Sequence, residues 1–150
     1  MRVVIQRVSR ASVKIEGEIT GQINRGLMIL LGIETADSRA DVEWLVRKIL
    51  SLRIFSDAEG RMNECLSDIQ GEVLIVSQFT LHAKTKKGAR PSFIHAAHPD
   101  HAVPLYEEFI REMERVMQRP VATGKFGADM SVELVNDGPV TLIIDSQNKE

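Results

Sequence analysis

The sequence predicts a mixed fold, α/β or α+β, in which a sheet layer carries two packed helices. Several segments show the alternating or wholly apolar character of strands, and two longer segments show helical periodicity. Their order along the chain is strands, helix, strands, helix, strands. This order favours a layered architecture with the helices packed against the sheet.

The first third of the chain predicts four strands. Val13 and Ile15 alternate with Ser12 and Lys14, which is the period of a half-buried strand. The run at 27–31 is apolar throughout and lies between two glycines, so we expect a strand that is buried on both faces. The strands are expected at 2–8, 11–16, 19–23 and 27–31.

Two segments have apolar residues at spacings of three and four, as an amphipathic helix requires. The first helix is expected over about 38–51, with Asp37 or Ser38 as its cap. The second is expected over about 101–118, with Asp100 as its cap and Pro120 beyond its end. The apolar faces comprise Val42, Leu45, Val46, Ile49 and Leu50 in the first helix, and Leu105, Tyr106, Phe109, Ile110, Met113, Val116 and Met117 in the second.

The other segments predict strands joined by turns and loops. The segment 72–81 carries the strongest strand pattern in the chain, and a turn is expected at 57–60. We expect the last residues, 147–150, to form a frayed polar tail. The further strands are expected at 52–56, 129–135 and 139–145.

Composition is typical of one globular domain over residues 1–150. The formal net charge is −2, so any contact with nucleic acid has to come from a local basic patch. Cys65 is the only cysteine, which excludes an internal disulfide. We find no signal-peptide pattern and no apolar run long enough to span a bilayer. We therefore expect a cytoplasmic protein without a membrane partner.

Three segments carry a more specific signal. They are Ser77-Gln78-Phe79-Thr80-Leu81, Gly88-Ala89-Arg90-Pro91-Ser92-Phe93 and Asn136-Asp137-Gly138-Pro139-Val140-Thr141. Together with residues 6–13 and 123–130, they resemble the D-aminoacyl-tRNA deacylase family along essentially the whole chain. The resemblance implies a three-layer ββα sandwich with mixed, largely antiparallel sheets and both main helices on one face. It also implies a homodimer, with each active site at the interface, and no cofactor.

The resemblance assigns catalysis to Ser77, Gln78, Phe79 and Thr80. Hydrolysis of an aminoacyl ester needs a polarised carbonyl, a delivered water or hydroxyl, and a stabilised oxyanion. Thr80 is a candidate nucleophile, but the motif holds no base to activate it. We therefore favour main-chain donors with a positioned water and the ribose 2′-OH of the tRNA. Without the resemblance, a plain strand with polar Ser and Thr side chains is the alternative.

Gly138 and Pro139 are expected to reject L-aminoacyl groups. The resemblance implies a cis bond between them and places the dipeptide in the pocket of the partner subunit. There it would fill the space that an L side chain needs, and the rejection would work by exclusion. Glycine has no side chain to exclude, so glycyl-tRNA, including glycine mischarged on tRNA(Ala), is also an expected substrate. Arg7 resembles the residue that holds this dipeptide, although a solvated strand arginine is the alternative.

Two further groups of residues are expected to contact tRNA. Lys84, Lys86, Lys87 and Arg90 form a basic loop suited to phosphates of the acceptor stem, or simply a solvated loop. Phe126 resembles an aromatic platform for the terminal adenine, and Met130 is expected near the same end of the site. Core packing is the alternative for both.

The histidines suggest a metal site that we do not predict. His95, His98 and His101 are spaced by three, with His82 nearby. However, Pro99 breaks any helix that would place the three on one face.

Two other functions stay open. A non-catalytic RNA-binding module would bind tRNA whether or not it carries an amino acid. An editing domain for a different aminoacyl ester would share the fold but cleave another charged tRNA.

Overall fold

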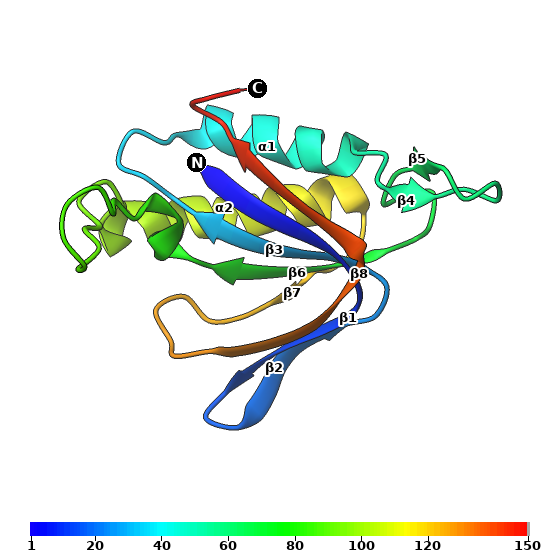
Figure 1. Cartoon of the computed structure of the whole chain (residues 1–150), viewed down its shortest axis with the longest axis horizontal. Coiled ribbons are helices and arrows are strands. Elements are labelled where there is room, and N and C mark those ends of the chain that lie inside the picture. The colour runs from blue at the N-terminus through cyan, green and yellow to red at the C-terminus, as the bar shows by residue number, and fades with distance from the viewer. Residues whose placement is uncertain (150) are drawn as a thin grey trace.

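The computed structural model describes residues 1–149 and contains eight strands, two α-helices and one short 3₁₀ helix, η1 (Figure 1). The predicted mixed α/β fold is confirmed. In chain order the elements are β1 (Arg2–Ile15), β2 (Glu18–Ile23), β3 (Gly26–Gly32), α1 (Arg39–Ser51), β4 (Phe55–Ser56), β5 (Met62–Glu64), β6 (Glu72–Ser77), η1 (Phe79–His82), α2 (Pro99–Met117), β7 (Ala122–Thr123) and β8 (Ser131–Asp145).

Six of the strands form one sheet in the order β2-β1-β3-β6-β7, and β8 pairs with β1. The first half of β1 pairs with β3 and its second half pairs with β2, while β8 follows β1 along both halves. These pairs are antiparallel, whereas β6 runs parallel to β3 and β7. The sheet is therefore mixed and largely antiparallel, as predicted.

Two apolar cores lie on opposite faces of β3 and β6. On one face, Ile29 and Ile75 pack with residues of α1 and α2. On the other face, Met28 and Leu74 pack against residues of β2 and the second half of β1. The helices thus cover one side of the sheet, and its folded-over half covers the other (Figure 1).

Two long strands replace four predicted short ones. The segments expected at 2–8 and 11–16 are one continuous strand, β1, and those expected at 129–135 and 139–145 are one strand, β8. The register between β1 and β8 shifts twice, between Gln6 and Val8 and between Val8 and Arg10. Such bulges bend a strand without ending it, which explains why a break in the sequence pattern is not a break in the strand.

Several predicted boundaries were wrong. The strand expected over 72–81 ends at Ser77, and the strand expected at 52–56 is reduced to Phe55–Ser56. The second helix begins at Pro99, and its N-cap is His98 and not Asp100. Proline fits the first turn of a helix because its missing N–H is not needed there. No sequence pattern had indicated the short strands β5 and β7.

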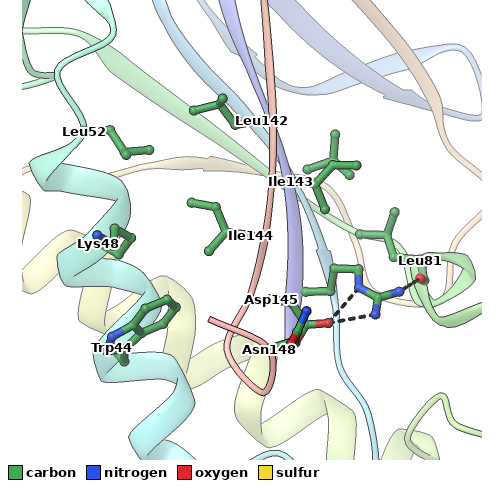
Figure 2. A pocket seen from close by; sticks show the side chains of 11 residues that line it. Trp44, Lys48, Leu52, Leu81, Leu142, Ile143, Ile144, Asp145 and Asn148 are labelled. Atoms are coloured by element: carbon green, nitrogen blue, oxygen red, sulfur yellow. Dashed lines mark hydrogen bonds and ion pairs between the residues drawn. The ribbon is translucent and has the colours of Figure 1, made fainter. Parts of the chain in front are cut away.

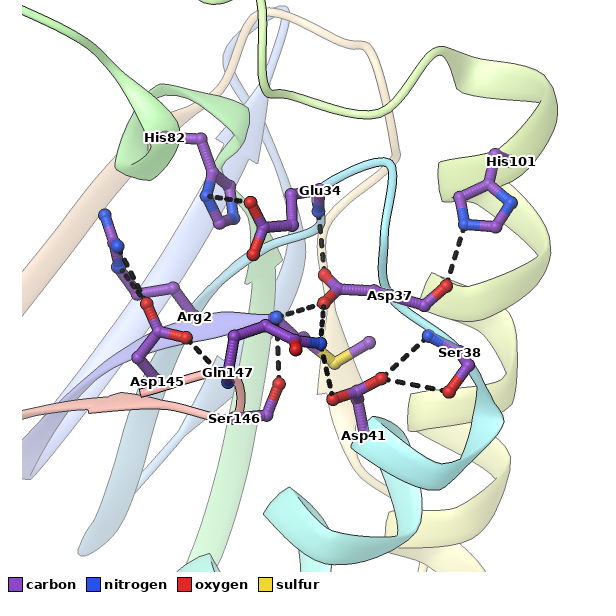
Figure 3. A network of polar contacts seen from close by, with 11 residues as sticks. Arg2, Glu34, Asp37, Ser38, Asp41, His82, His101, Asp145, Ser146 and Gln147 are labelled. Atoms are coloured by element: carbon purple, nitrogen blue, oxygen red, sulfur yellow. Dashed lines mark hydrogen bonds and ion pairs between the residues drawn. The ribbon is translucent and has the colours of Figure 1, made fainter. Parts of the chain in front are cut away.

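The chain ends are joined by a polar network (Figure 3). The α-amino group of Met1 donates to Asp37 and to the Ser146 hydroxyl. The Gln147 side chain donates to carboxylates of Asp37 (3.3 Å) and Asp41 (3.0 Å). The prediction of a frayed tail was therefore wrong at Gln147, because its side chain has partners on α1 and on the residue before the N-cap of α1; residue 150 lies outside the described residues.

In the part of the chain that the structure describes, no helix combines the length and apolar character needed to cross a membrane.

Candidate functional site

A cavity of about 280 Å³ opens where β6 ends and the chain approaches β8. It brings together five of the predicted site residues from two distant parts of the sequence: Ser77, Gln78, Phe79, Phe126 and Met130. Thr80 follows directly but does not line the cavity. The other lining residues are Leu31, Ile33, Val76, Ala97, Ala102, Gly127, Ala128, Asp129 and Val132.

The first wall of the cavity is the turn from β6 into η1. The N–H of Gln78 donates to the carbonyl of Leu31 (2.7 Å), which is the last bond that ties this segment to β3. The next internal bond runs from the N–H of Leu81 to the carbonyl of Gln78 (3.2 Å). A 3₁₀ helix leaves its first N–H groups without an intrahelical acceptor. Here these are the N–H groups of Phe79 and Thr80.

The Thr80 side chain is already engaged. Its Oγ1 accepts a hydrogen bond from the side-chain amide of Gln78. This contact stiffens the turn that carries the two main-chain donors. The pairing of Gln78 with Thr80 could not be predicted, because the segment was expected to remain an extended strand.

The opposite wall rests on Tyr106, a residue that the sequence placed only in the core. Its hydroxyl donates to the carbonyl of Ile75 (3.2 Å), and burial raises its pKa to about 12. The Phe126 ring packs on Tyr106 with centroids 5.7 Å apart. Phe126 and Met130 are half-buried, so each both packs on a core and lines the cavity.

The Gly138–Pro139 peptide bond is cis, as the resemblance implies. The dipeptide lies in a bulge of β8, where Asp137–Val140 stand opposite the single residue Arg7 of β1. Gly138 has a φ of +121°, and a Cβ there would lie 2.7 Å from Nη2 of Arg7. Only glycine accommodates both that backbone conformation and that close approach.

Arg7 is buried and holds the base of this bulge. Its Nε donates to the carbonyl of Asp137 (3.1 Å) and lies 3.2 Å from the Asp137 carboxylate. Its Nη1 donates to the carbonyl of Ile54 (2.6 Å). Asn136, to which the motif assigned no role of its own, donates from Nδ2 to the carbonyls of Arg7 (2.9 Å) and Val140 (3.0 Å). The two side chains together fix where the dipeptide projects.

The structure does not bring the dipeptide to the cavity of the same chain. Val132 lines the cavity, and Gly138 is six residues further along the same strand. At the rise of an extended strand, this separation is roughly 20 Å. The dipeptide therefore does not line the cavity of its own chain.

The basic loop lies outside the cavity. Lys84, Lys86, Lys87 and Arg90 are exposed. The loop is closed at its base by two main-chain hydrogen bonds between Lys84 and Ser92, of 2.8 and 2.9 Å. The loop follows η1 directly in the chain, so its base lies next to the 3₁₀ helix that carries Phe79.

Neither of two other features adds a site. A larger cavity, about 660 Å³, lies between α1 and β8 beside Trp44 and Ile143 and contains none of the predicted site residues (Figure 2). Among residues 1–149, no group of three or more His, Cys, Asp or Glu side chains is placed to hold a metal ion. The smaller cavity brings Phe79, whose N–H has no intrahelical acceptor, together with an aromatic and thioether wall formed by Phe126 and Met130, an arrangement suited to an acyl group attached to a nucleoside.

Comparisons with known proteins agree with the motifs. The family model described as D-Tyr-tRNA(Tyr) deacylase matches residues 4–145. Proteins named D-aminoacyl-tRNA deacylase from Cytophaga hutchinsonii and Bacteroides fragilis are 59% and 57% identical over 150 residues, covering all of both chains.

Two solved structures share the fold. One, titled c-Myc DNA Unwinding Element Binding Protein, is 41% identical with a TM-score of 0.92 and covers 97% of this chain and 98% of its own. The other, titled a probable eukaryotic D-amino acid tRNA deacylase, is 18% identical with a TM-score of 0.82, covering 95% and 97%, and supports the fold alone. From the family model and the full-length relatives, the chain belongs to the D-Tyr-tRNA(Tyr) deacylase family of enzymes.

Proposed function

We propose that this protein hydrolyses the ester bond of D-aminoacyl-tRNA and releases the free D-amino acid and tRNA. One observation carries the proposal. Gln78 and Phe79 at the start of η1 and the Phe126 wall line one cavity, in a chain whose full-length relatives are named for this activity.

The chemistry follows from preorganised donors. In the proposed complex, the N–H groups of Phe79 and Thr80 point at the ester carbonyl and stabilise the oxyanion that develops on it. Main-chain donors fixed in this way can be worth about 3–4 kcal/mol each in the transition state. A positioned water supplies the attacking oxygen, the ribose 2′-OH assists by hydrogen bonding, and the ester oxygen leaves as the 3′-hydroxyl of the tRNA. The Thr80 hydroxyl is already bonded to Gln78 and has no neighbouring base in its motif, which argues against a covalent role.

The same proposal assigns binding roles along the cavity. Phe126 and Met130 hold the terminal adenosine, because both line the cavity while being supported from behind by Tyr106 and by the second core. Lys84, Lys86, Lys87 and Arg90 contact backbone phosphates of the acceptor stem. Such contacts position the tRNA but read no sequence.

Chiral selection requires a second copy of the chain. We assign rejection of L-aminoacyl groups to Gly138 and Pro139 of a partner subunit in a homodimer, with Arg7 holding the bulge that presents them. The roughly 20 Å of strand between the dipeptide and the cavity of its own chain supports this assignment. In an isologous dimer, one such exchange builds two equivalent sites. Glycyl-tRNA, including glycine on tRNA(Ala), escapes exclusion and is cleaved.

The direct test compares D-tyrosyl-tRNA and D-aspartyl-tRNA with their L forms, using the purified protein with no added metal. We expect release of both D-amino acids and almost no hydrolysis of either L form. Intact D-aminoacyl-tRNA after incubation with micromolar protein would contradict the proposal. A wider panel of charged tRNAs separates it from an editing function, which would prefer a different amino acid and ignore chirality.

A second candidate function is nucleic-acid binding without turnover. It is favoured by the 41% identical structure, whose title names a DNA-element binding protein, and by the exposed basic loop. This function predicts that charged and uncharged tRNA bind equally and that no amino acid is released. The deacylation assay therefore separates the two candidates.

A further inference from the structure

An exposed pair of aromatic rings lies at the mouth of the cavity. The rings of Phe79 and Phe93 form a T-shaped contact, with centroids 5.1 Å apart and planes at 72°. Phe79 is 55% exposed and Phe93 is 36% exposed, although phenylalanine is usually buried. Phe79 also lines the cavity, so the pair continues its wall outward. Exposed aromatic clusters of this kind mark interaction sites.

The chain segment that carries the pair is positively charged. Between Glu72 and Asp100 the chain has no acidic residue, while it carries four Lys and Arg side chains. Phe93 directly follows Ser92, whose main chain pairs with Lys84 and closes the basic loop. Along the chain, the two rings therefore flank the four cations, and Phe79 also lines the cavity. Aromatic platforms that flank a cationic track are the features with which proteins bind single-stranded nucleic acids.

We propose that Phe79 and Phe93 form a stacking platform for the unpaired nucleotides that precede the terminal adenosine of the tRNA. This inference rests on the proposed function, because it requires the terminal adenosine to occupy the cavity. The 3′ end of a tRNA then leaves the cavity over the aromatic pair, and its duplex part reaches the basic loop. Stacking tolerates any base, because every base offers a π face.

The platform gives the enzyme a way to recognise tRNA without reading the acceptor stem. Base stacking on an aromatic ring contributes to binding of the whole tRNA and contributes nothing to binding of an aminoacyl-adenosine, which lacks the preceding nucleotides. The platform therefore acts on the KM for tRNA. Only the tRNA substrate has nucleotides that can stack on the platform, so a comparison of the two substrates tests the inference.

The test measures kcat/KM for D-tyrosyl-tRNA and for D-tyrosyl-adenosine in the wild-type protein and in Phe93→Leu and Phe93→Trp. For Phe93→Leu, we expect the ratio of the tRNA value to the adenosine value to fall about five- to tenfold, mainly through KM for the tRNA. Phe93→Trp restores the ratio, because it restores an aromatic face. The matched control is Ile94→Ala, which removes an adjacent apolar side chain that is 78% exposed; we expect its ratio to stay within about twofold of wild type.

A second measurement reports stacking itself. Uncharged tRNA carrying 2-aminopurine next to the terminal adenosine loses fluorescence when the modified base stacks. We expect quenching on binding to wild type and Phe93→Trp, and much weaker quenching with Phe93→Leu at saturating protein.

The outcomes separate the two proposals. A wild-type protein that cleaves neither substrate would overturn the proposed function, and the platform with it. Cleavage by the wild type with an unchanged ratio in Phe93→Leu would overturn the platform alone. Equal reductions on both substrates in Phe93→Leu would also overturn it, since they would show a structural role for the ring.

Discussion

At Thr80, the side chain and the main chain have different tasks. The hydroxyl oxygen accepts a hydrogen bond from the Gln78 amide, whereas the N–H lies at the beginning of η1 with no intrahelical acceptor. Replacing a side chain that only fixes the turn lowers activity modestly, whereas replacing a nucleophile abolishes most of it. The proposed chemistry therefore depends on the backbone of residues 79 and 80 and much less on the identity of the side chain.

We expect Thr80→Ala to lower kcat for D-tyrosyl-tRNA by no more than about tenfold. Removing a true nucleophile costs on the order of a millionfold in a serine hydrolase. Single-turnover kinetics on purified Thr80→Ala checks this, with circular dichroism as the control for folding. Complete loss of activity in a correctly folded variant would revive the covalent mechanism.

Among the elements, the loop between η1 and α2 carries the proposed tRNA binding and the bulge in β8 carries the proposed chiral selection, and both are held at their bases. Two main-chain hydrogen bonds between Lys84 and Ser92 close the loop. Arg7 and Asn136 hold the bulge through carbonyls of neighbouring strands and loops. The loop tip stays exposed and cationic, which suits contact with phosphates whose positions vary between tRNAs.

Neutralising the tip of this loop should weaken tRNA binding and reduce its dependence on salt. For Lys86→Ala combined with Lys87→Ala, we expect the slope of log K against log salt to fall in magnitude by about 0.7–0.9 for each phosphate that is no longer neutralised. Filter binding of uncharged tRNA over a range of salt concentrations measures it. Lys14→Ala combined with Lys48→Ala removes the same charge elsewhere and should leave the slope unchanged; equal slopes in both double variants would argue against a role for the loop.

For the whole molecule, the central feature is that the cavity and the Gly138–Pro139 bulge lie at opposite ends of one stretch of β8. A single chain cannot supply both to one site. The proposed enzyme is therefore a dimer in which each copy completes the site of the other. This organisation makes selectivity a property of the assembly.

Mixed dimers test this organisation. In a dimer of one Phe126→Ala chain and one Pro139→Ala chain, one composite site carries both changes and the other carries neither. We expect about half of the wild-type D-specific activity per dimer, with L-aminoacyl-tRNA still rejected at the unaltered site. Tandem purification on two different tags isolates the mixed species for this assay. Mixed dimers that behave only as the average of the two homodimeric variants would place each site within one chain.

Much of the fold could be predicted because periodicity reports which face of an element is buried. The apolar positions of α1 and α2 and the buried strand β3 follow directly from such patterns. The patterns failed where local and long-range requirements conflict. Residues 78–81 look like a continuation of β6, but the pairing with β3 ends and the chain turns into η1.

The candidate site was predicted only in part. Motifs identified Ser77, Phe126 and Gly138 as candidate site residues, although no pattern showed that the first two line one cavity. Tyr106 was missed because a buried tyrosine on a helix face looks the same whether or not it supports a site. The hydrogen bonds of Asn136 were missed because they join two carbonyl groups, those of Arg7 and Val140, that only the strand register brings together.

The sequence by itself determined the mixed fold, the two helices with their apolar faces, and the motif residues that mark the family. Only the tertiary structure decided that β1 and β8 are continuous bent strands, that residues 77–79 meet residues 126–130, and that Gly138–Pro139 lies away from the cavity of its own chain. The physical reason is the separation along the chain between the residues that interact. Side-chain periodicity is set by neighbours a few residues apart, whereas register shifts and cavity walls depend on pairings between residues far apart in the chain.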